Sequence, residues 1–72
     1  MKLVINGEEV TSKDGLNVSE LLVEQEVKMP EMVSVELNGE ILEREKFEST
    51  VLSENSKVEF LYFMGGGVSG TN

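Results

Sequence analysis

Few residues of this chain have the types and spacing that catalytic chemistry requires. Three glutamates, Glu43, Glu45 and Glu48, lie close together in the segment "EREKFE", where carboxylates could bind a metal ion or act as an acid and base pair. A solvated, charged turn is the favoured interpretation of such a segment. The chain has no histidine and no cysteine, which removes the commonest general base, the commonest metal ligand and every thiol nucleophile. The sequence therefore predicts neither catalytic residues nor a metal site.

The second feature is a run of three glycines at residues 65–67, directly after the hydrophobic segment "VEFLYFM". Five further residues, "VSGTN", follow the glycines. Glycine adopts backbone conformations that other residues avoid. Composition alone favours a flexible linker into a disordered tail. We therefore expect a folded domain over residues 1–64 and a mobile glycine-rich arm over residues 65–72.

Length and charge limit the class of protein. The 72 residues carry a formal net charge of -8, so one small domain is expected, with little affinity for nucleic-acid phosphate or anionic membranes. A basic protein partner would be favoured. The N-terminus reaches charged residues before a useful apolar stretch forms, and no run approaches the roughly 20 apolar residues of a membrane span. These features predict a cytoplasmic protein.

The first third of the chain predicts a hairpin and one helix. The segment "KLVINGEEV" contains Asn6-Gly7, and two residues that tolerate positive φ suit a type I′ turn between two strands. Further along, Asn17 and Glu20 form a capping-box pattern. Apolar residues at helical spacing follow Asn17, which predicts an amphipathic helix of roughly ten residues. The residues expected on its buried face are Val18, Leu21, Leu22 and Gln25.

The remainder of the chain predicts strands. The segment "VSVEL" alternates, with Val33, Val35 and Leu37 on one face, and Asn38-Gly39 provides another turn. The charged segment after it holds one anchor, Phe47. The overall pattern predicts an α+β fold, with a mixed sheet of four to five strands packed on one helix.

The last predicted strand is apolar on both faces, which is typical of a central strand. One face carries Val58, Phe60, Tyr62 and Met64, and the other carries Leu61 and Phe63. Since one helix covers only one face of a sheet, the second face is expected to expose an apolar patch for a partner. The alternative is that the segment around residues 40–49 covers it. The residues expected to contact a partner are Leu61, Phe63, Met64 and Gly65.

These segments, taken together, resemble the ThiS family, the sulfur carriers of thiamine biosynthesis, which have the β-grasp, ubiquitin-like fold. The resemblance covers residues 1–67 and rests on "KLVINGEEV", "NVSELL", "VSVELNGEILERE", and "VEFLYFMGGG". Arg44 and Phe47 stand where the family usually has an arginine and an aromatic residue, more often tryptophan. The position of the glycines, straight after the last strand, is the most specific part of the match.

The resemblance implies a carrier and not an enzyme. In such carriers the C-terminal glycine carboxylate is adenylated and then converted to a thiocarboxylate, which donates sulfur for thiazole formation. The matching position here is Gly67, with Gly66 before it. The resemblance implies no bound cofactor, since the ATP is used by a ThiF-like adenylating enzyme. The other implied partners are a ThiG-like thiazole synthase and a sulfur donor such as a cysteine desulfurase.

The chain departs from the family pattern at its end. Family members typically end at Gly-Gly, whereas here Val68 to Asn72 follow the glycines. We expect a peptidase to remove these residues. Two alternatives remain open from the sequence. The chain could carry sulfur in another pathway, such as molybdopterin or cysteine synthesis, or it could be a non-catalytic ubiquitin-like interaction domain.

Overall fold

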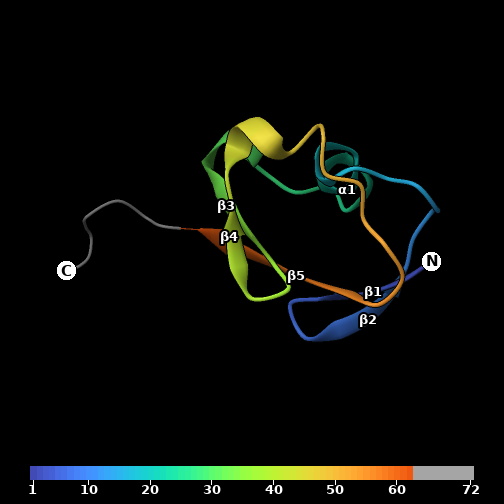
Figure 1. Ribbon diagram of the computed structural model, residues 1–72. Coiled ribbons are helices and arrows are strands. Elements are labelled where there is room, and N and C mark those ends of the chain that lie inside the picture. Colours follow the sequence, from blue (N-terminus) through green and yellow to red (C-terminus); the bar gives the residue numbers. More distant parts are fainter. Residues whose placement is uncertain (63–72) are drawn as a thin grey trace.

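The computed structural model describes residues 1–62 and contains a five-stranded mixed sheet with one α-helix (Figure 1). The sheet order is β2-β1-β5-β3-β4. The strands are β1 (Lys2–Ile5), β2 (Glu8–Thr11), β3 (Val33–Leu37), β4 (Glu40–Leu42) and β5 (Ser56–Tyr62). The helix is α1 (Val18–Glu24), and two short 3₁₀ turns are η1 (Pro30–Met32) and η2 (Arg44–Lys46).

The two Asn-Gly turns close the hairpins that the sequence predicts. Asn6 and Gly7 have φ values of 50° and 85°, and Asn38 and Gly39 have values of 52° and 89°. Positive φ at both central residues defines a type I′ turn, whose twist matches that of antiparallel strands. The turns join β1 to β2 and β3 to β4, which pair antiparallel.

Helix α1 begins as predicted and ends earlier. Asn17 accepts a hydrogen bond from the backbone N–H of Glu20 at 2.7 Å, and the Glu20 carboxylate accepts one from the N–H of Asn17 at 2.9 Å. This capping box satisfies two N–H groups that would otherwise lack partners. The helix has seven residues rather than about ten, because Glu26 has a φ of 55° and cannot continue a right-handed helix.

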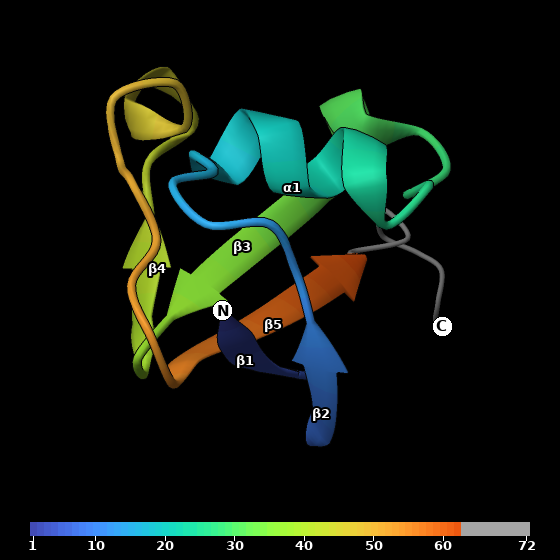
Figure 2. The same ribbon diagram turned by 90° about the vertical axis from the view of Figure 1, so that its right-hand side faces the viewer.

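The hydrophobic core lies between the sheet and the layer formed by α1, η1 and η2 (Figure 2). The predicted helix face is largely confirmed, since Val18, Leu21 and Leu22 are buried and Gln25 is half-buried. Phe47 is buried as the predicted anchor of its segment. The full set of buried apolar residues is Leu3, Ile5, Val18, Leu21, Leu22, Val33, Val35, Phe47, Leu52 and Val58.

Strand β5 is the central strand, as predicted. It runs parallel to β1 and antiparallel to β3. The prediction that it is apolar on both faces is wrong for the described residues, because Lys57 and Glu59 share a face with Leu61. We call this side, opposite α1, the open face of the sheet. Phe47 enters the core on the α1 side, so the segment around η2 does not cover the open face (Figure 2).

A hydrogen bond between Ser12 and Glu24 ties the end of β2 to the end of α1. The buried Ser12 hydroxyl donates to the Glu24 carboxylate at 2.5 Å, and this bond holds the pKa of Glu24 below its ordinary value, although partial burial acts in the opposite direction. Because the folded pKa is the lower one, the stabilisation is present above the ordinary glutamate pKa of about 4.3. It is lost as the pH falls through the lowered, folded value.

This bond leads to a pH-dependent prediction for Ser12→Ala. We expect the variant to lose about 1 kcal/mol of unfolding free energy at pH 7, the usual net value of such a bond. The difference from the parent chain should shrink as the pH falls below the ordinary glutamate pKa and through the lowered, folded pKa of Glu24. Urea denaturation at pH 7 and pH 3 measures both values. Thr11→Ala, at the exposed neighbouring position, is the control, and a loss in Ser12→Ala that is equal at both pH values would contradict the assignment.

None of the helices within residues 1–62 is long and apolar enough to cross a membrane.

Candidate functional site

Both hairpin turns hold β5, the strand that leads to the glycines. The Asn6 side-chain oxygen accepts a hydrogen bond from the N–H of Phe60, and the Asn38 side-chain oxygen accepts one from the N–H of Lys57, both at 2.9 Å. The backbone N–H groups of the same asparagines donate to the carbonyls of Val58 and Lys57. The two turns therefore bind β5 from both sides and fix the position of the strand that precedes the glycines. The φ preference of Asn-Gly predicts the turns from the sequence, but nothing in the sequence indicates these bonds.

The last described residue is also held in place. Tyr62 pairs with Val33 in the β3–β5 register, and its hydroxyl donates to the carbonyl of Lys28 at 3.2 Å. Tyr62 remains 43% exposed. Tyr62 lies on the same face as Val58 and Phe60, as the alternation of the sequence predicts. The predicted positions Phe63, Met64, Gly65, Gly66 and Gly67 lie outside the described residues.

Leu61 lies on the open face together with a few apolar side chains and several charged ones. Leu61 is half-buried and pairs with Ser34. Val4 and Ile41 are the other apolar side chains that the strand registers place on this face. The charged residues placed there by the same registers are Lys2, Glu9, Glu36, Lys57 and Glu59. Leu61 thus lies on the face that was expected to meet a partner, although the face is less apolar than expected.

The carboxylates Glu43, Glu45 and Glu48 are exposed around η2. Within residues 1–62 the structure contains no group of three or more acidic side chains close enough to hold a metal ion. The three side chains therefore face solvent separately and do not form a shared site in this part of the chain.

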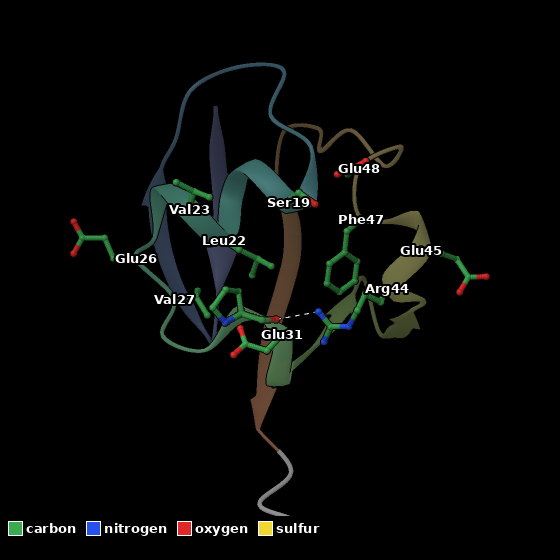
Figure 3. A pocket seen from close by; sticks show the side chains of 11 residues that line it. Ser19, Leu22, Val23, Glu26, Val27, Glu31, Arg44, Glu45, Phe47 and Glu48 are labelled. Atoms are coloured by element: carbon green, nitrogen blue, oxygen red, sulfur yellow. Dashed lines mark hydrogen bonds between the residues drawn. The ribbon is translucent and has the colours of Figure 1, made fainter.

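Arg44 has a structural role that the sequence did not reveal. Its guanidinium donates to the carbonyl of Pro30 at 3.0 Å and to the carbonyl of Val33 at 2.5 Å, and it lies 5.2 Å from the centre of the Phe47 ring (Figure 3). These contacts tie η2 to η1 and to the start of β3. A planar guanidinium with several donors suits this bridging position better than a lysine would. The same edge of the molecule carries the Tyr62 end of β5.

Comparison with known proteins gives a consistent assignment. A family model described as the ThiS family matches residues 2–67. The crystal structure of a thiamine biosynthesis protein (ThiS) from Geobacter metallireducens has a TM-score of 0.87 and 52% identity, covering 93% of this chain and 100% of that chain. The NMR solution structure of a thiamine biosynthesis protein from the same organism has a TM-score of 0.75 and 49% identity, covering 100% and 95% of the two chains.

Two curated relatives are longer. The proteins named thiazole synthase from Paramagnetospirillum magneticum and Magnetococcus marinus are 39% and 34% identical to this chain over 67 residues, which is 93% of it. The chain spans only 20% of the length of each.

The fold and the family match agree. One helix on a five-stranded mixed sheet with a central last strand is the arrangement of the ThiS-like β-grasp structure from Geobacter metallireducens. The resemblance seen in the sequence is therefore confirmed, and this chain belongs to the ThiS family.

Proposed function

We propose that this chain is a sulfur carrier whose Gly67 carboxylate, once free, becomes a thiocarboxylate that supplies the sulfur of a thiazole ring. The observation that carries the proposal is the family match, which extends through all three glycines to residue 67. The position of β5 supports it, because the strand that precedes the glycines is the central one and is bonded to both hairpins.

The chemistry requires a carboxylate and two partner reactions. The Gly67 carboxylate attacks the α-phosphate of ATP, pyrophosphate leaves, and an acyl-adenylate remains. Hydrosulfide then attacks the acyl carbon, the bond to AMP breaks, and the thiocarboxylate forms as AMP leaves. Where the donor is an enzyme persulfide, the first product is an acyl disulfide, which a thiol reductant cleaves with two electrons to give the thiocarboxylate. An adenylate leaves far more readily than the oxygen of a free carboxylate, which is why activation comes first. The chain supplies the acyl group, and its partners supply the acid–base chemistry.

The proposed partners follow from these steps. A ThiF-like enzyme performs the adenylation, a donor such as a cysteine desulfurase provides sulfur, and a ThiG-like thiazole synthase accepts it. Two relatives named thiazole synthase contain a segment similar to this chain, which supports the last partner. A peptidase that cleaves after Gly67 would release the required carboxylate from residues 68–72. Bare glycine backbone suits entry of this carboxylate into an enzyme channel.

Mass spectrometry tests the proposal directly. The chain ending at Gly67 is incubated with ATP, the adenylating enzyme and a sulfur source from the same organism. The proposal requires a product in which one oxygen has been replaced by sulfur, and it fails if no such product forms.

The open face gives a separate prediction about docking. We expect Leu61→Glu to leave the fold intact, because Leu61 lies outside the core. The new carboxylate would lie within an apolar contact. It should therefore raise the KM of the adenylating enzyme for this chain by about tenfold, which corresponds to a loss of about 1.4 kcal/mol of binding free energy. Kinetics with the chain ending at Gly67 measure this effect. Val51→Glu adds the same charge at a 63% exposed position away from the sheet and is the control; equal KM values for the two variants would exclude the open face as the docking surface.

A further inference from the structure

A groove on the α1 side of the molecule is separate from both the open face and the described end of β5. It has a volume of about 710 Å³ and runs between α1, η1 and η2 (Figure 3). Its apolar lining includes Leu22, Val27, Pro30 and Phe47. Figure 3 shows Leu22, Val27 and Phe47 turned toward the centre of the groove. Leu22 and Phe47 are each only 5% exposed, so the floor is formed by side chains that the core already fixes.

The walls of the groove are preformed. Val23, on the outer side of α1, is 78% exposed and adds apolar surface beside the floor. On the other wall, Arg44 bridges η2 to η1 and to β3 through its two carbonyl contacts. The chain turn that ends α1 at Glu26 is also fixed. The N–H groups of Glu26 and Val27 donate to the carbonyls of Val23 and Leu22, respectively, which is a Schellman motif. A ligand would therefore meet a shaped, largely apolar surface.

The rim of the groove is acidic. Glu26, Glu31, Glu45 and Glu48 border it, and Figure 3 shows Glu26 and Glu45 extending outward from opposite sides. Within the described part of the chain, none of these four carboxylates lies in a salt bridge. The one cation of the lining, Arg44, already donates to two backbone carbonyls and lies against the Phe47 ring. Arg44 keeps its charge in these contacts, so four negative charges and one positive charge leave the lining with a net charge of -3.

The charge of the rim restricts what can occupy the groove. A second copy of this chain carries a net charge of -8 and would be repelled. Nucleic acid and phosphate-bearing ligands are disfavoured for the same reason. Residues 68–72, "VSGTN", contain no basic side chain. A protein segment with basic side chains and an apolar anchor matches both the rim and the floor.

We propose that this groove docks a segment of a partner protein in which an apolar side chain is flanked by lysines or arginines. The apolar side chain occupies the space between Leu22, Val27 and Phe47, and the flanking cations lie beside the rim glutamates. Because the groove and the open face are on opposite sides of the sheet, a partner held in the groove leaves the open face accessible. The proposal does not depend on sulfur-carrier chemistry.

Selection from a random dodecapeptide display library, panned against the full chain, tests the proposal. We expect the enriched peptides to share an apolar residue flanked by basic ones. Titration of the ¹⁵N-labelled chain with the most enriched synthetic peptide should shift the amide resonances of α1 and η2 and leave those at the centre of β5 unchanged. The absence of enriched peptides, enrichment of peptides without basic residues, or shifts centred on the open face would overturn the proposal.

Two matched double variants distinguish the effect of the rim charges on peptide binding from the effect of the net charge of the chain. Glu31→Gln with Glu45→Gln removes two charges from the rim, and Glu36→Gln with Glu59→Gln removes two from the open face. We expect the rim variant to weaken peptide binding by about fivefold, as two exposed charge pairs would. The open-face variant should bind as the parent does. Equal weakening in both variants would mean that net charge alone attracts the peptide and would overturn the groove assignment.

The apolar surface beside the floor is tested through Val23→Lys, which places a cation there at an exposed position that tolerates it. We expect this variant to keep the parent spectrum outside α1 and to lose binding of the selected peptide. Retained binding would place the peptide elsewhere.

Discussion

The chain ending at Gly67 is expected to be adenylated and then to gain sulfur, whereas the 72-residue chain is expected to remain unchanged in the same mixture. In the longer chain the Gly67 carbonyl forms the peptide bond to Val68. An amide has no carboxylate oxygen to attack the α-phosphate of ATP. The effect is therefore all or none, and intact-mass spectrometry of the two chain lengths reads it directly.

Substitution of Gly66 provides the control for this experiment. In the shorter chain, Gly66→Trp keeps the terminal carboxylate and adds a bulky side chain next to it. We expect adenylation to be lost because glycine alone leaves the arm narrow enough for a restricted channel. Heteronuclear NMR spectra should show that residues 1–62 keep their fold. Adenylation of the 72-residue chain at Asn72 would refute the choice of Gly67, and so would a Gly66→Trp variant that reacts at the parent rate.

The second large effect is expected from Leu21→Ala. Leu21 is fully buried between α1 and the sheet, and removing most of its side chain leaves a cavity that the neighbouring elements fill only in part. We expect a loss of about 3 kcal/mol of unfolding free energy. A domain of this size has a small stability reserve, so the variant should be partly unfolded at 37 °C.

Urea denaturation followed by circular dichroism measures this loss. Val23→Ala is the matched control, because Val23 lies on the same helix, is 78% exposed and is also shortened to alanine. Alanine has the higher helix propensity, so the control should change stability by less than about 0.5 kcal/mol. Equal losses in the two variants would show that α1 does not pack on the sheet through Leu21.

The parts of the fold that local sequence determines were predictable. Asn6-Gly7 and Asn38-Gly39 set their turns through backbone preference alone, and Asn17 with Glu20 sets the start of α1. The central place of β5 was predicted from apolar residues on both of its faces, and the strand is central although its described part is apolar on one face only. Each of these signals lies within a few residues of the feature that it determines.

The parts that depend on distant contacts were not predictable. The end of α1 depends on the positive φ of Glu26. Glutamate rarely adopts a positive φ, so the residue type does not predict a helix end at this position. The full polarity of the open face depends on strand pairing, which places Glu36 and Glu9 on the same face as Leu61. The bonds from Asn6 and Asn38 to β5 and the bridge made by Arg44 join segments far apart in the chain. The site residues Gly66 and Gly67 came from the family resemblance and remain a prediction.

The parallel pairing of β1 with β5 also has a consequence for synthesis on the ribosome. Leu3 pairs with Ser56, so the middle of the sheet joins the first strand made to the last strand described. Until β5 has been synthesised, Leu3 and Ile5 lack a neighbour on one side, and closing this long loop is slow compared with forming either hairpin. A nascent or prematurely terminated chain without β5 therefore has neither a complete core nor the glycines that follow it. The chain order itself ensures that the three glycines are synthesised only after all the strands found within residues 1–62.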